Sequence, residues 1–331
     1  MAPQPFQNGA LYRTFCILAL LITASFAFQN PTGIKPKGYF GLRTHEHSSP
    51  NLISTRTSCL SSRGGDESST PSPKHQLQRE MLAEAMGTFL IVHLGCGVVC
   101  SSIFHATTSG LYQIAAVWGM AVSIAIYCTA SISGAHLNPA ISVAMALLRN
   151  SKKKDGDGGG FGWGKVLPYV AAQGMGAFLG GLVNFGLFRD SIVTFEREMG
   201  IVRGSLQSVA SAAAFGEYWS VTNWQSAFFA EALGTAILSF VIFSVTSPKN
   251  DDIPPKAAPL LIGGTVASLI TVIAPLTQAG FNPARDFGPR LVTFLAGWGG
   301  EVAFKGWWVY ILAPIVGAVF GGSLSKLVTG E

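Results

Sequence analysis

The tripeptide Asn-Pro-Ala occurs twice in the chain, and each copy opens a short apolar stretch. Asn is a good helix N-cap and Pro is favoured in the first helical turn, so each copy predicts the start of a helix. The amide groups of both Asn side chains can donate hydrogen bonds, and two helix N-termini would add positive potential beside them. The motif residues are Asn138, Pro139, Ala140, Asn282, Pro283 and Ala284.

Two carboxylates also stand inside apolar segments, at Glu84 and Glu231. An ionisable group in a membrane span is costly and is a functional candidate by default. A proton relay is one interpretation of the pair, and a structural role in satisfying nearby backbone groups is the other.

The segments that carry these residues indicate an all-α membrane protein. The chain has 331 residues, of which 49% are hydrophobic and 12% charged, against about 25% charged in soluble domains. Two apolar stretches, from Asn138 to about Arg149 and from Asn282 to about Leu295, are too short to cross a bilayer. Segments of spanning length lie near 81–104, 112–132, 166–187, 226–247, 258–277 and 306–327.

The two halves of this region repeat each other. Residues 83–88 match residues 230–235, and the two Asn-Pro-Ala motifs follow at nearly the same separation. Each repeat, at about 81–188 and 226–327, holds three spans, so the second copy enters from the opposite face. Lys and Arg concentrate on one side, called here the inner side, and the connection 188–225 lies on the outer side.

The composition argues against several other classes. The net charge of +5 is thinly spread, and the cluster from Arg149 to Lys154 is a topology signal rather than a nucleic-acid surface. Five cysteines show no metal or redox spacing, and no nucleophile, base and orienting residue recur together. We therefore expect no catalytic residue, no metal, no cofactor and no nucleic-acid partner.

The first eighty residues have the composition of a targeting sequence. Residues 1–27 predict a signal peptide with cleavage before Phe28, and residues 28–75 predict a basic, hydroxylated, disordered presequence. Together they resemble the bipartite presequence of algae with complex plastids. We therefore expect a multi-pass protein of the plastid envelope or the surrounding endomembrane, with a membrane of the secretory pathway as the alternative. The membrane domain is then 76–331.

Paired Asn-Pro-Ala motifs in an inverted repeat resemble the aquaporin superfamily, and the likeness runs from about Glu80 to Lys326. The resemblance implies six transmembrane helices, two half-helices that meet at mid-membrane with both Asn side chains at the pore, and a homotetramer in lipid. It implies that Glu84 and Glu231 accept backbone N–H groups. His136 is expected either to line the narrow mouth or to pack its loop.

Residues 275–290 closely resemble the bacterial glycerol facilitator, and Asp286 marks the glycerol-conducting branch, the aquaglyceroporins. The expected function is passive passage of glycerol and other small uncharged solutes, with water, and exclusion of ions and protons. A channel selective for water, peroxide or a metalloid acid and, less so, a secondary transporter are the alternatives. Counting from the motifs gives four filter residues, a set that looks more like one group of plant nodulin-like intrinsic proteins: Trp118, Ile270, Ala279 and Arg285.

Overall fold

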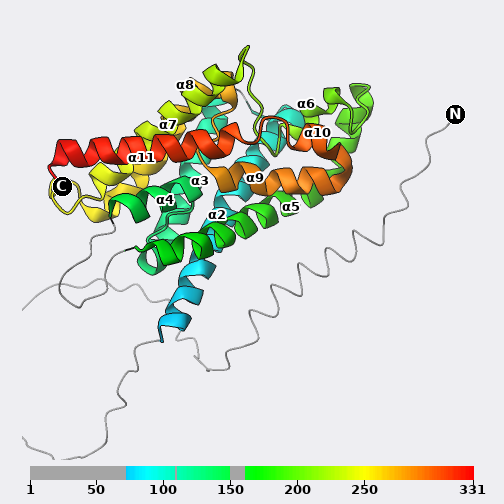
Figure 1. Ribbon diagram of the computed structural model, residues 1–331. Coiled ribbons are helices and arrows are strands. Elements are labelled where there is room, and N and C mark those ends of the chain that lie inside the picture. Colours follow the sequence, from blue (N-terminus) through cyan, green and yellow to red (C-terminus); the bar gives the residue numbers. More distant parts are fainter. Residues whose placement is uncertain (1–71, 109, 150–160) are drawn as a thin grey trace, which may run out of the picture. The chain divides into compact units, whose positions relative to one another are not determined.

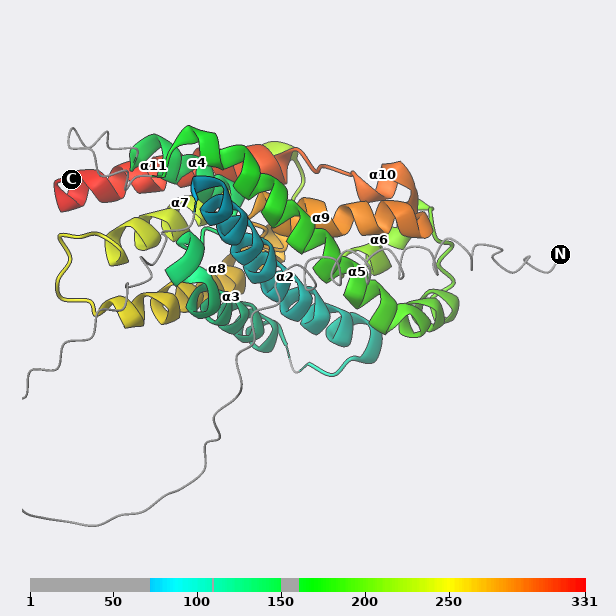
Figure 2. The ribbon, with the colours of Figure 1, turned by 90° about the horizontal axis from the view of Figure 1, so that it is seen from below.

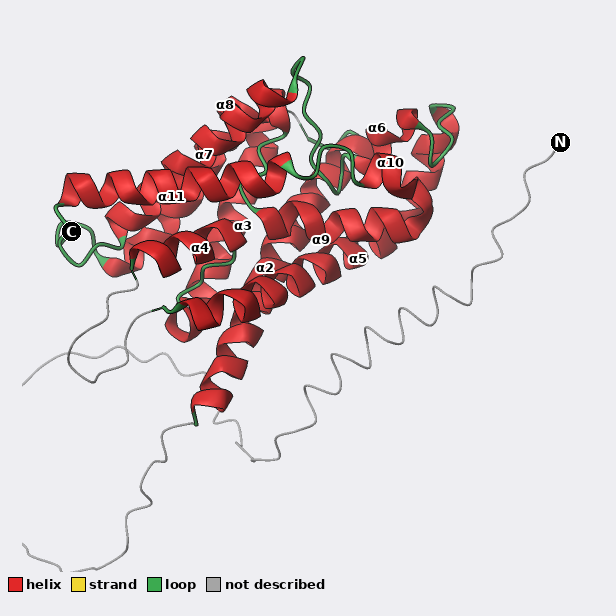
Figure 3. Cartoon of the chain, in the orientation of Figure 1, coloured by secondary structure: helices red, strands yellow, loops and turns green. Residues whose placement is uncertain are grey.

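The computed structural model describes residues 72–108, 110–149 and 161–331. The predicted signal peptide and nearly all of the predicted presequence lie outside these residues. The described part is helical and contains no strand (Figure 3). Its helices are α2 (Pro73–His105), α3 (Leu111–Ser133), α4 (Pro139–Leu148), α5 (Val166–Glu198), α6 (Val209–Ala212), α7 (Trp224–Val245), α8 (Ala258–Thr277), α9 (Pro283–Thr293), α10 (Gly299–Ala303) and α11 (Val309–Thr329), with short 3-10 turns at Trp163–Lys165, Leu206–Ser208 and Pro255–Ala257 and a π-helical turn at Phe294–Trp298.

In the described part of the chain, six helices are long and apolar enough to cross a membrane, as the sequence predicts. Two of them extend further than the predicted spans. The first begins at Pro73 rather than near residue 81, because Ser72 caps its N-terminus and Pro73 fits its first turn. The third reaches Glu198 rather than residue 187. An apolar window marks where a helix meets lipid, and polar turns continue the helix beyond it.

The packing of the helices repeats in the two halves (Figures 1 and 2). In the first half α2 packs on α3 and α5, and in the second α7 packs on α8 and α11. Each half-helix lies against the last helix of the other repeat, α4 on α11 and α9 on α5, while α3 and α8 pack on each other. Exchanging the repeats leaves this pattern unchanged, as an inverted repeat requires.

Glycine allows the closest of these crossings. A Cβ atom on Gly176 would collide with the carbonyl of Ala85, where α5 crosses α2. A Cβ atom on Gly317 would collide with the carbonyl of Ala232, where α11 crosses α7. Small residues let membrane helices approach closely, and here they occupy matching positions of the two repeats.

Candidate functional site

The two half-helices begin at the Asn-Pro-Ala motifs, where the sequence predicts them. The Oδ1 atom of Asn138 accepts the N–H of Ala140 at 2.9 Å, and that of Asn282 accepts the N–H of Ala284 at 3.0 Å. In both cases the following Pro occupies the first helical position. Each Asn is therefore a true N-cap, and its amide is held at the positive end of a helix.

The two motifs are also bonded to each other. Asn138 donates from Nδ2 to the carbonyl of Phe281 at 2.9 Å, and Asn282 donates from Nδ2 to the carbonyl of Leu137 at 2.8 Å. An amide nitrogen carries two N–H groups, and in each Asn one of them donates to the opposite loop. The second N–H of each amide takes no part in these two bonds.

Both loops before the half-helices bend through unusual backbone conformations. Leu137 and Phe281 have φ values of 52° and 54°, and Ala135 and Ala279 have 50° and 64°. Positive φ is uncommon in residues other than Gly and persists only where the surroundings hold it.

Glu84 and Glu231 hold these loops, and both side chains are fully buried. Glu84 accepts the N–H groups of His136 at 2.9 Å and Leu137 at 2.7 Å. Glu231 accepts those of Gly280 at 3.0 Å and Phe281 at 2.8 Å. Without water in a bilayer, irregular backbone must find such partners inside the protein. These contacts favour the structural interpretation over a proton relay.

Hydroxyl and amide groups complete the bonding of the two carboxylates. Ser133 and Gln173 donate to Glu84 at 2.6 Å and 2.7 Å. Thr277 donates to Glu231 at 2.6 Å. The two halves therefore share the same arrangement, in which a buried glutamate accepts hydrogen bonds from one hydroxyl and from two loop amides.

A cavity of about 890 Å³ runs past the two motifs. The residues that line it include both Asn side chains and His136. They also include the four predicted filter residues, Trp118, Ile270, Ala279 and Arg285, each no more than 5% exposed. The burial of Trp118 shows that its ring faces the protein interior rather than lipid.

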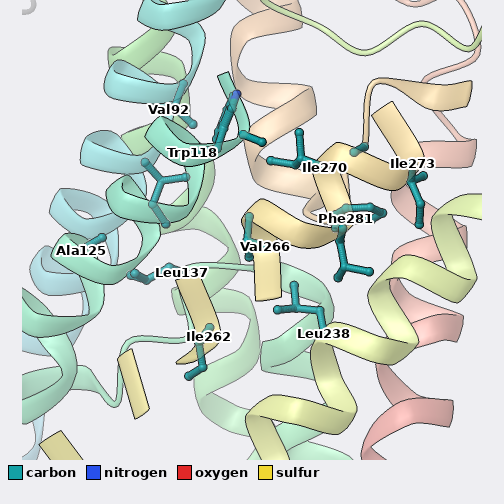
Figure 4. Close-up of a cluster of buried hydrophobic side chains, with 14 of the residues drawn as sticks. Val92, Trp118, Ala125, Leu137, Leu238, Ile262, Val266, Ile270, Ile273 and Phe281 are labelled. Atoms are coloured by element: carbon teal, nitrogen blue, oxygen red, sulfur yellow. The ribbon is translucent and has the colours of Figure 1, made fainter. Parts of the chain in front are cut away.

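The filter residues come from separate elements and meet on one cavity. Trp118 is on α3, Ile270 on α8, Ala279 in the loop before α9 and Arg285 on α9. The guanidinium carbon of Arg285 lies 4.1 Å from the centre of the Trp118 ring, a cation-π contact. Figure 4 shows Trp118 and Ile270 at one end of a set of apolar side chains.

Apolar side chains continue from the filter toward the motifs. Val266, Ile262 and Leu238 line the same cavity as the filter and belong to the same buried cluster (Figure 4). The cavity thus has a continuous apolar surface, while hydrogen-bond donors come from Arg285 and the two Asn amides.

His136 does both of the things that the sequence left open. It lines the cavity, and its ring also packs against Phe161 at 4.3 Å and Tyr169 at 5.3 Å between centroids. Tyr169 in turn donates to Glu80 at 3.1 Å, and Lys165 forms an ion pair with Glu80 at 2.8 Å. This aromatic group lies at the inner end of the cavity.

One residue of the site was not identified from the sequence. Glu217, in the outer connection, forms a buried ion pair with Arg285. Its side chain is 4% exposed, so Arg285, the predicted filter cation, has its counter-charge inside the protein. The only signal in the sequence was an acidic residue in a long connection, which does not reveal its partner.

The similarity to known proteins covers the helical region described above. The family model for the major intrinsic protein matches residues 72–324. The glycerol uptake facilitator protein of Pseudomonas aeruginosa is 40% identical over 260 residues, covering 76% of this chain and 89% of that protein. The propanediol uptake facilitator PduF of Citrobacter freundii is 38% identical over 263 residues, covering 77% and 93%.

A solved structure has the same fold. The X-ray structure of the aquaglyceroporin from Plasmodium falciparum aligns with a TM-score of 0.63 and 28% sequence identity. The alignment covers 76% of this chain and 97% of that one.

Proposed function

The chain belongs to the major intrinsic protein family, and from this we propose that it is a passive membrane channel for glycerol and other small uncharged solutes, with water as a second permeant. The observation that carries the proposal is the set of residues around the cavity. A buried aromatic ring in cation-π contact with the Arg285 guanidinium and an aliphatic wall line the cavity, and further along it two Asn amides are held at helix N-termini. The names of the facilitator relatives agree with this chemistry.

The mechanism follows from how a polyol is built. Its carbon backbone can contact Trp118, Ile270 and the aliphatic side chains beyond them, while its hydroxyl oxygens accept from Arg285 and then from Asn138 and Asn282. These contacts replace the solute's hydration step by step, so the solute can enter the pore and is not bound too tightly to leave it. Positive potential from Arg285 and from the two helix N-termini repels cations and protons.

We propose a channel rather than a coupled transporter or an enzyme because Glu84 and Glu231 are committed to loop amides. In vesicles containing the purified protein, glycerol flux should rise linearly with the glycerol gradient and should not depend on imposed proton or sodium gradients. Flux that saturates or follows an ion gradient would favour a secondary transporter. Urea, hydrogen peroxide and boric acid, measured in the same vesicles, test the alternative solutes.

We propose that residues 1–75 address the protein to the plastid envelope or the surrounding endomembrane of a complex-plastid alga. Fused to a fluorescent protein in such an alga, this segment should direct fluorescence to the plastid region. A uniformly cytosolic signal would remove the targeting proposal, and a signal confined to secretory membranes would favour an ordinary secretory signal. The homotetramer is likewise a proposal, which native mass spectrometry of the purified protein checks.

A further inference from the structure

The outer connection has a buried stretch with no regular structure beside the filter. Residues 214–218 are all buried, and residues 217–220 belong to no helix. Buried backbone of this kind needs hydrogen-bond partners from elsewhere. The partners of Glu217 in this stretch come from α9, the half-helix that carries Arg285.

Asp286 and Arg290 hold the backbone of Glu217 from both sides. Asp286 accepts the N–H of Glu217 at 2.7 Å, and Arg290 donates from Nη2 to the carbonyl of Glu217. The two α9 residues are also an ion pair at 2.7 Å, with side chains 0% exposed. Both hydrogen-bonding groups of the Glu217 backbone are therefore held by one buried pair.

The other groups of Arg290 are used as well. Its Nη1 atom donates to the carbonyls of Ala303 at 2.7 Å and Lys305 at 3.2 Å. A Cβ atom on Gly216 would lie 2.8 Å from Cγ of Arg290, so glycine at this position admits the arginine stem. The planar guanidinium thus joins α9, the outer connection and the segment after α10, an arrangement that an ammonium group does not reproduce.

The hydrogen bonds of the Glu217 backbone with Asp286 and Arg290 determine the position of the Glu217 carboxylate, the counter-charge of Arg285. The Oε1 atom of Glu217 forms the ion pair with Arg285, and the other carboxylate oxygen, Oε2, is buried without a hydrogen-bond partner among the described residues. The position of the carboxylate therefore depends on Arg285 itself and on the backbone that Asp286 and Arg290 hold.

We propose that Asp286 and Arg290 are positioning residues of the filter, which act through Glu217 to hold the Arg285 guanidinium against Trp118 and out of the solute's path. The proposal rests on the proposed glycerol channel. It gives the Asp286 that marks the glycerol-conducting branch a physical role distinct from contact with solute.

The test is a double-mutant cycle on the ratio of glycerol to water permeability in vesicles that contain equal amounts of folded protein. Asp286→Asn keeps the side-chain shape but removes the charge that Arg290 pairs with. A released Arg285 side chain obstructs glycerol more than water, so the ratio should fall by about threefold or more. Glu217→Gln should lower the ratio in the same way.

The combination of the two variants distinguishes positioning from a general loss of packing. If Asp286 acts through Glu217, adding Asp286→Asn to Glu217→Gln should change the ratio little further, because coupled residues are not additive. Glu196→Gln is the matched control, since it breaks a second ion pair of the outer connection, Glu196 with Arg203 at 2.7 Å. It should lower thermal stability and leave the ratio unchanged.

Two results would overturn the proposal: an unchanged ratio in folded Asp286→Asn protein, or an equal effect of this change with and without Glu217→Gln. Should Asp286→Asn not fold, Arg290→Lys takes its place in the cycle, because it keeps the charge and loses the planar fork. Wild-type glycerol flux equal to that of empty vesicles would instead defeat the proposed function, and the cycle would then be read on water permeability and proton leak.

Discussion

Replacing Ala279 by Phe should reduce glycerol permeability by about tenfold or more while reducing water permeability by only a few-fold. Ala279 is 2% exposed and lines the cavity together with Trp118, Ile270 and Arg285. A phenyl ring there would fill the space through which a three-carbon polyol passes, whereas a single water molecule needs far less room. Ile270→His should shift the ratio in the same direction, by adding bulk and a polar group that competes for the solute's hydroxyls.

The measurement is stopped-flow light scattering on vesicles that contain equal amounts of folded protein. The alternative outcome is overpacking, in which the folded yield falls and the ratio stays constant. Backbone conformation alone does not forbid the larger residue, because Phe281 already takes a similar positive φ two residues later. Val272→Phe is the matched control, since Val272 is on the same helix as Ile270 but is 71% exposed. An unchanged glycerol-to-water ratio in Ala279→Phe would mean that the filter assignment is wrong.

Replacing Arg285 by Val should keep neutral-solute flux and raise the leak of protons and cations by about tenfold or more. Two effects act together. The variant loses the fixed positive charge at the filter, and it leaves the Glu217 carboxylate buried without its counter-charge. An uncompensated buried charge is strongly unfavourable, so Glu217 would either attract cations or take up a proton.

A second variant separates these two effects. Arg285→Val combined with Glu217→Gln removes both charges and should leak less than Arg285→Val alone. Arg203→Val is the control, because Arg203 also belongs to an ion pair of the outer connection but pairs with Glu196. Leakage is measured as the decay of a pH gradient across vesicles that contain correctly inserted protein. If Arg285→Val leaks no more than wild type, the barrier to cations lies elsewhere in the pore.

The sequence predicted the architecture because its main signals are local. Asn138 and Asn282 cap the half-helices with their own side chains, and each proline fits the turn that follows. Apolar length predicts a span without knowledge of its neighbours. Helix ends were less accurate: the segment predicted to end near Leu295 leaves α-helical geometry after Thr293, and its π-helical turn contains Gly297 with φ 97°.

The contacts around the filter were harder to predict because they join distant segments. Glu217 and Asp286 are 69 positions apart, and nothing in either local sequence identifies the other as its partner. The sequence identifies Asp286 as a mark of the glycerol-conducting branch but gives it no physical role. The cross-bonds from Asn138 and Asn282 to opposite loops likewise depend on the two half-helices meeting end to end. Local patterns predict which residues line the cavity, but not the hydrogen bonds that these residues form with one another.

Glycerol permeability of vesicles with and without the purified wild-type protein shows whether the chain conducts glycerol passively. The channel should raise glycerol permeability well above that of protein-free vesicles, with an activation energy lower than that of diffusion through lipid, and it should raise water permeability in the same preparation. Correctly inserted protein that raises water permeability but leaves glycerol permeability at the protein-free value would contradict passive conduction of glycerol.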